Sequence, residues 1–96
     1  MLKWVAYINH IRTVYMDRFT ITKTRRWGNV QTEINNVYSV SRGKTKRDDV
    51  IRMANDLISG EDVMTNEEIE YEVLLSYDNG NTEFIHRVEK SGKKSL

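Results

Sequence analysis

Two alternating apolar segments on either side of Asn79-Gly80 constrain the fold of this chain most strongly. A two-residue hairpin loop needs positive φ angles, which asparagine and glycine tolerate, so this pair predicts a type I′ turn. Because strand side chains alternate between faces, the register follows from the turn. The predicted core-facing pairs are Tyr71/Val88, Val73/His86, Leu75/Phe84 and Tyr77/Thr82.

The reverse face of this hairpin is mostly polar but contains one apolar pair. Glu70, Glu72 and Arg87 are charged there, whereas Leu74 and Ile85 lie opposite each other in the predicted register. Two explanations are open. Either another segment covers the apolar pair, or the pair forms the centre of a partner-binding surface, since clustered exposed apolar groups indicate contact sites.

An amphipathic helix is predicted before the hairpin. Its apolar positions recur at helical spacing and are Val50, Ile51, Ala54, Leu57 and Ile58. Gly60 supplies a stop signal, because glycine tolerates the positive φ that often follows a last helical turn. Thr45 and Asp48 partly match a capping box at the start.

Before residue 45, β-branched and aromatic residues favour strands. We expect strands at residues 3–11, 19–26 and 30–40, the last two joined by a turn at Gly28-Asn29. A helix over residues 3–16 is the alternative for the first segment, because its apolar residues also fit a helical stripe. The predicted fold is α+β: a small antiparallel sheet with one packed helix, in the order β-β-β-α-β-β.

The chain has 96 residues, which suits one domain, placed here at residues 1–90. Residues 91–96 are predicted to be a flexible tail, because they can bury little apolar surface. A small core leaves little stability in surplus, which favours association, including a homodimer. The absence of cysteine removes thiolate and disulfide chemistry. Since no apolar run is long enough to span a bilayer, we expect a cytoplasmic location without membrane contact.

Charges are segregated along the chain although the net charge is only +1. Residues 61–72 contain acidic side chains and no basic one. Such carboxylates could imitate nucleic-acid phosphates toward a basic partner, or could simply line the solvent side of a strand. Lys23, Arg25 and Arg26 precede Trp27 near the predicted hairpin end. This tip could contact a protein, could stack on single-stranded nucleic acid, or could pack Trp27 internally.

A second basic group surrounds the predicted helix start and contains Arg42, Lys44 and Lys46. Gly43-Lys44-Thr45 resembles the end of a phosphate-binding loop, but Tyr38 occupies the position of that motif's first glycine. Amides at a helix N-terminus with nearby cations can hold a phosphate or an acidic side chain. The alternative is a helix cap flanked by solvated cations.

Catalysis is disfavoured by the sequence. His10 and His86 are the two histidines, and neither has a metal-ligand or triad partner at a recognisable spacing. We therefore predict no catalytic residues, no metal site and no cofactor. His86 is expected on the inner face as a hydrogen-bonded or rim histidine.

In size, composition and arrangement, the chain resembles small bacteriophage accessory proteins that bind and inhibit a host enzyme or defence complex. The resemblance implies a non-enzymatic binding protein with a host protein partner. The predicted contact residues are Arg25, Arg26, Trp27, Glu70, Glu72, Leu74 and Ile85.

The alternative function is a small module that binds RNA or single-stranded nucleic acid. In this case Lys23, Arg25, Trp27, Arg42, Lys44 and Lys46 would form one basic surface. Convergence of the two basic segments on one sheet face with Trp27 exposed would favour nucleic acid. A buried Trp27 with clustered carboxylates would favour the inhibitor.

Overall fold

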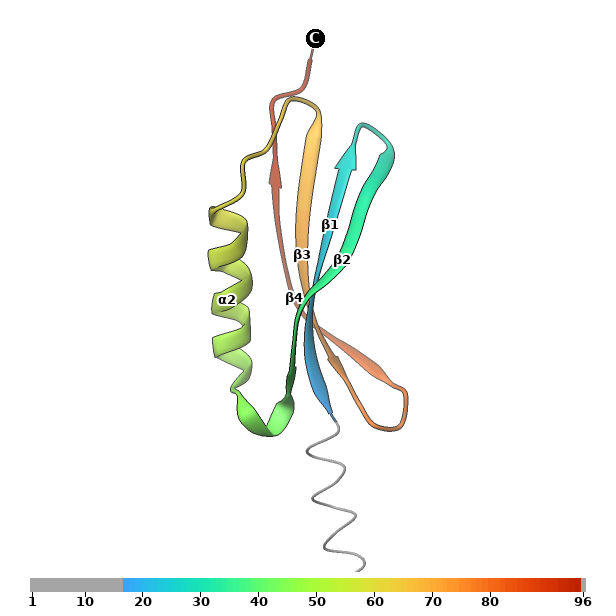
Figure 1. The fold of residues 1–96 in the computed structure, drawn as a ribbon, viewed down its shortest axis with the longest axis vertical. Coiled ribbons are helices and arrows are strands. Elements are labelled where there is room, and N and C mark those ends of the chain that lie inside the picture. The colour runs from blue at the N-terminus through green and yellow to red at the C-terminus, as the bar shows by residue number, and fades with distance from the viewer. Residues whose placement is uncertain (1–16, 96) are drawn as a thin grey trace, which may run out of the picture.

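The computed structural model describes residues 17–95 as a four-stranded antiparallel sheet with one α-helix on one face (Figure 1). In chain order the elements are β1 (Arg18–Trp27), β2 (Val30–Ser41), the 3-10 turn η1 (Arg42–Lys44), α2 (Arg47–Ser59), β3 (Glu67–Ser76) and β4 (Thr82–Ser91). The predicted α+β class and the order of these elements are confirmed. The prediction for residues 3–11 lies outside the described residues.

The sheet order is β2-β1-β3-β4, so two hairpins meet along β1 and β3. The β1–β3 ladder is antiparallel and pairs Phe19 with Leu75 and Ile21 with Val73, with no register shift along its length. Two segments far apart in the sequence therefore form the middle of the sheet. The hairpins themselves are local, as the turn signals predicted.

The core lies between the sheet and α2. Alternation along β1 and β3 turns one set of apolar side chains toward the helix, and the buried residues are Phe19, Ile21, Val50, Ala54, Ile69, Tyr71, Val73 and Leu75. The helix packs mainly on β3 and β4 (Figure 1). Of the predicted helical stripe, Val50 and Ala54 are buried, whereas Leu57 is exposed.

The predicted capping residues at the start of the helix and the predicted role of glycine at its end both need correction. The N-cap of α2 is Lys46 and makes no side-chain cap bond, so the capping box from Thr45 to Asp48 is wrong. Asp48 and Asp49 in the first turn favour the helix start through the helix dipole instead. Gly60 follows the helix as predicted, but its φ is −86°, and a positive φ is therefore not what selects glycine there.

Five residues separate β3 from β4, and a backbone hydrogen bond between the first and the last of them encloses a three-residue turn, so the predicted type I′ turn is wrong. The Tyr77 amide donates to the Asn81 carbonyl at 2.8 Å, and the Gly80 amide donates to the Tyr77 carbonyl at 3.0 Å. Within the loop only Gly80 has a positive φ, +91°. Side-chain bonds favour the longer loop, because Asn79 Oδ1 accepts from the Asn81 amide at 3.0 Å.

The predicted strand register holds only in the half of the hairpin that lies far from this loop. Tyr71 pairs with Val88 and Val73 with His86 as predicted, but a bulge follows Val73. Beyond the bulge, Leu74 pairs with Phe84, Leu75 with Glu83 and Ser76 with Thr82.

Ile85 is the extra residue of this bulge and packs against the core. The predicted pairing of Leu74 with Ile85 is therefore wrong, and Phe84 takes the exposed place beside Leu74. His86 is partly buried, and its Nε2 lies 3.1 Å from Asn55 Oδ1 of α2, which confirms the hydrogen-bonded histidine.

Truncation of two side chains of α2 tests which of its predicted apolar residues face the core. We expect Val50→Ala to lower the free energy of unfolding by about 2 kcal/mol, because Val50 is buried. Leu57→Ala removes a larger side chain but should cost less than about 1 kcal/mol, since Leu57 is exposed. Urea denaturation followed by circular dichroism measures both. A larger loss for Leu57→Ala would contradict the orientation of α2.

Glycine substitutions test the two corrected backbone positions. Gly80→Ala should lower stability by about 1–2 kcal/mol, because alanine is strained at the φ of +91°. At Gly60, with φ of −86° and only ordinary van der Waals contacts for an added Cβ, alanine should be neutral or stabilising by up to about 1 kcal/mol. Thermal unfolding compares the two variants, and equal losses would argue against the loop geometry.

Candidate binding surface at the hairpin tip

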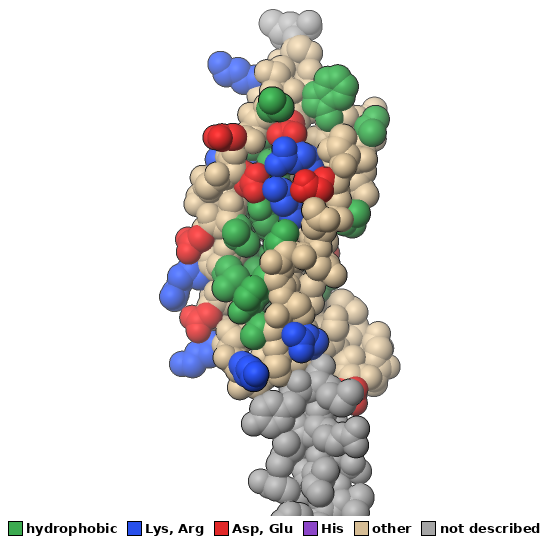
Figure 2. All heavy atoms as spheres, viewed as in Figure 1, with side chains coloured by type: hydrophobic (Ala, Val, Ile, Leu, Met, Phe, Trp, Pro, Cys, Tyr) green, Lys and Arg blue, Asp and Glu red, His purple; other side chains and the backbone are tan. Residues whose placement is uncertain are grey.

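Ionic groups replace the apolar core beyond the C-terminal end of α2. Lys23 and Arg25 continue the helix-facing side of β1 after Ile21, and both reach Glu61, which follows the helix. Lys23 Nζ lies 2.9 Å from Glu61 Oε1, and Arg25 Nη2 lies 3.4 Å from Glu61 Oε2. Tyr71 on β3 donates its hydroxyl to Glu61 Oε1 at 2.6 Å. Figure 2 shows basic and acidic side chains alternating in one cluster near the upper end of the sheet.

Two further carboxylates complete this network. Arg25 Nη1 lies 3.2 Å from Glu67 Oε2, and Glu33 on β2 lies 3.9 Å from both Lys23 and Arg25. The side chains of Lys23 and Arg25 are 14% and 28% exposed. Three carboxylates therefore surround two partly buried cations, so both cations are already paired within the chain.

The hydrogen bond from Tyr71 shifts two pKa values in opposite directions. It lowers the pKa of Glu61, with Lys23 and Arg25 adding to the effect and burial opposing it. Burial is the main reason that the pKa of Tyr71 lies well above its usual range, and the Glu61 carboxylate raises it further. The network is thus stable with Glu61 ionised and Tyr71 neutral.

On the opposite sheet face, Arg26 and Glu70 form a second ion-pair group. Arg26 Nη1 lies 3.3 Å from Glu70 Oε2, and Arg87 Nε on β4 lies 3.0 Å from Glu70 Oε1. Glu70 is buried, and Glu72 is partly buried opposite Arg87. Of the predicted contact residues, Arg25, Arg26 and Glu70 therefore stabilise the sheet internally.

Trp27 stands at the end of β1 and is 58% exposed. Its Nε1 donates to the Thr65 carbonyl at 3.2 Å, so the indole is oriented without being buried. Val30, its cross-strand partner, is 61% exposed, and Met64, next to Thr65 in the loop after α2, is 71% exposed. We call Trp27, Val30 and Met64 the tip patch. Val30 and Met64 were not predicted as contact residues. Val30 belongs to an alternating pattern that predicts a strand without showing which face is exposed, and Met64 belongs to no periodic pattern.

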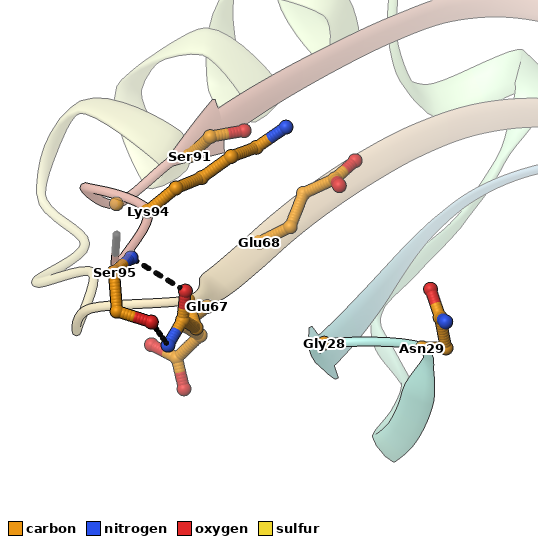
Figure 3. Close-up of a pocket in the computed structure, with 9 residues that line it drawn as sticks. Gly28, Asn29, Glu67, Glu68, Ser91, Lys94 and Ser95 are labelled. Atoms are coloured by element: carbon orange, nitrogen blue, oxygen red, sulfur yellow. Dashed lines mark hydrogen bonds between the residues drawn. The ribbon is translucent and has the colours of Figure 1, made fainter.

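A polar groove of about 370 Å³ lies at the same end of the molecule (Figure 3). Its lining comes from the β1–β2 turn, the start of β3 and the C-terminal segment, and consists of Gly28, Asn29, Asn66, Glu67, Glu68, Ser91, Gly92, Lys94 and Ser95. The Gly28 amide donates to the Asn66 carbonyl at 3.0 Å, which ties the turn to β3.

The C-terminal segment is hydrogen-bonded along the start of β3. The Gly92 amide donates to the Glu67 carbonyl at 2.9 Å, and the Ser95 amide donates to Asn66 Oδ1 at 3.0 Å. β4 itself runs to Ser91, one residue into the predicted tail. The flexibility of the tail stays a prediction.

The second basic group lies at the other end of the sheet. β1 begins at Arg18, beside Ser41, and ends at Trp27, and a strand of this length spans about 30 Å. Arg42 follows Ser41, and its Nη1 lies 3.1 Å from Asp17 Oδ2, with the guanidinium over the Tyr77 ring. The structure therefore does not bring Arg42, Lys44 and Lys46 together with Lys23, Arg25 and Trp27.

Comparisons with known proteins suggest no function for this chain, so the function has to be inferred from its surface. The chain matches no protein-family model, no curated protein and no solved structure. Within residues 17–95, no helix is both long and apolar enough to cross a membrane. In the same part of the chain, no three His, Cys, Asp or Glu side chains are grouped so that they could hold a metal ion.

Acid titration should reveal the Glu61 network. Because folding lowers the pKa of Glu61 below its usual value of 4.5, its contribution is present above that pH and is lost as the pH falls through the folded pKa. Glu61→Gln should cost about 2 kcal/mol at pH 7, and its free energy of unfolding should converge on that of the wild type at acid pH.

Urea titrations from pH 7 down to about pH 3 measure this convergence. Asp62→Asn is the control, since Asp62 is exposed and adjacent in the chain. Parallel pH curves for the wild type and Glu61→Gln would show that Glu61 is not the carboxylate responsible.

Proposed function

We propose that this chain is a non-enzymatic binding protein that covers part of a partner protein with its tip patch. The observation that carries the proposal is the concentration of exposed apolar surface at one end of the sheet, next to cations that are already neutralised. In its specific form, the proposal is a cytoplasmic inhibitor of a host enzyme or defence complex, of the kind found among phage accessory proteins.

Trp27 has the properties of an interface anchor. Its large ring is exposed, and its hydrogen bond to Thr65 limits the orientations that binding would otherwise have to restrict. Val30 and Met64 add apolar area around the ring, and the groove beside them offers polar groups for the rim of a contact. Inhibition would be steric, because the tip would occlude the surface on which it sits.

Leu74 and Phe84 form a smaller candidate contact on the uncovered sheet face. Phe84 is 58% exposed and pairs with Leu74, which is partly buried. We assign this pair a secondary role, because the neighbouring charged residues on that face are paired with each other.

Single-stranded nucleic acid is the second candidate. An exposed Trp27 was the expectation for nucleic acid and a buried one for the inhibitor, and the exposed Trp27 could stack on a base. The charge distribution argues against it. Lys23 and Arg25 are surrounded by carboxylates, and the group of Arg42, Lys44 and Lys46 lies at the far end of β1. Binding through the tip would then lack the phosphate contacts that supply most non-specific affinity.

Substitution of Trp27 tests the proposed anchor. We expect immobilised wild-type protein to retain a protein partner from a bacterial lysate, and Trp27→Ala to weaken the affinity for that purified partner at least about tenfold. Leu57→Ala is the control, because Leu57 is an exposed apolar residue of α2 outside both candidate contacts and should retain binding. Equal affinity of Trp27→Ala and wild type would overturn the role of the tip.

Fluorescence anisotropy with labelled single-stranded RNA and DNA at two salt concentrations tests the second candidate. The proposal predicts no binding at micromolar protein. Micromolar binding that weakens with salt and is lost in Trp27→Ala would instead establish nucleic-acid recognition through the tip.

A further inference from the structure

The two outer edges of the sheet differ in how they are protected. β2 and β4 are the edge strands, and within residues 17–95 no strand pairs with the outer side of β2. A strand in this position presents a row of backbone N–H and C=O groups to any second strand. β2 has 12 residues, and most of them are exposed.

Charge protects β4 but not β2. The β4 sequence contains Glu83, Arg87, Glu89 and Lys90, and α2 packs beside this strand (Figure 1). β2 contains one charged residue, Glu33, whose carboxylate faces Lys23 and Arg25 of its own chain. Proteins commonly discourage strand addition by charges or bulges on edge strands. β2 has one charge, and its two irregularities lie on either side of residues 33–36, which leaves this stretch regular.

Exposed β-branched side chains make β2 suitable for pairing. Ile34 is 58% exposed and Val37 is 42% exposed, although both are apolar. A neighbouring strand would cover them through cross-strand contacts, which stabilise sheets pair by pair. The exposed edge therefore carries both the backbone groups and the side chains that a second strand uses.

A second copy of this chain is the occupant that fits these features. We propose that two copies pair antiparallel through β2 and form one continuous eight-stranded sheet in the order β4-β3-β1-β2-β2-β1-β3-β4. An antiparallel edge is its own complement under two-fold symmetry. Because β2 holds a single charge, like charges oppose each other only in the register that places Glu33 against Glu33.

The favoured register is centred on Asn35, because two-fold symmetry pairs residues that point to the same sheet face. It places Asn35 opposite Asn35 of the second copy and Ile34 opposite Asn36, while Glu33 meets the uncharged Val37. Residues 33–36 lie between the two irregularities of β2 and pair with β1 without a shift. The centre of the proposed interface is therefore the regular part of the strand.

Sedimentation velocity of the full chain tests the proposal across a concentration series. We expect the wild type to approach twice the chain mass of 11.3 kDa as concentration rises. Ile34→Lys/Val37→Lys should remain at the monomer mass, because charge at these positions blocks strand addition. Phe84→Lys is the control, since Phe84 is exposed on the other hairpin, and this variant should dimerise like the wild type.

Several results would overturn the proposal: a wild type that stays monomeric throughout, a dimer that survives Ile34→Lys/Val37→Lys, or a dimer lost only in Phe84→Lys. Hydrogen exchange of the wild type covers the case in which the double lysine variant fails to fold. The β2 amides should exchange slowly at high concentration and faster on dilution, and equal rates would reject the interface. Ile34 and Val37 lie outside the tip patch, so this test can fail independently of the proposed function.

Discussion

The antiparallel ladder between β1 and β3 is the interaction on which the rest of the structure depends. It joins two hairpins that are otherwise local, and it runs without irregularity from Arg18 paired with Ser76 to Trp27 paired with Glu67. One half of the ladder places Ile21 beside Val73 under α2, which forms the core. The other half continues the same face past the helix, where charged side chains take the place of apolar ones.

The cations of the β1–β2 hairpin therefore mainly stabilise the fold. Lys23 and Arg25 lie on the core-facing side of β1, and partly buried charges there need partners, because removing one partner leaves the other desolvated and unpaired. Glu61 and Glu67 supply those partners from the loop after α2 and from β3. The tip therefore has two parts: a network of paired charges next to the core, and an exposed apolar end around Trp27. The proposed protein contact rests on the apolar end.

Local signals in the sequence predicted the hairpins, the helix and most of the core face of β3, because strand alternation and helical spacing reflect contacts between near neighbours. The turn could not be predicted from Asn79-Gly80 alone, since a hydrogen bond from the Asn81 amide to the Asn79 side chain and one from the Asp78 amide to Asp17 favour a three-residue turn. The bulge that moves Ile85 into the core depends on that loop. The partnership of Lys23 with Glu61 joins residues 38 positions apart, and it follows only once the sheet order is known.

The central claim is the sheet order, and nuclear Overhauser effects between Hα protons test it most directly. In an antiparallel ladder, alternate residue pairs bring their Cα atoms to about 4.5 Å, close enough for strong cross-strand signals. The account predicts such signals between residues 18–27 and 67–76, in the register that pairs Ile21 with Val73. Signals linking residues 18–27 to 82–91 instead would place β4 in the middle of the sheet and contradict the core, the ionic network and the tip together.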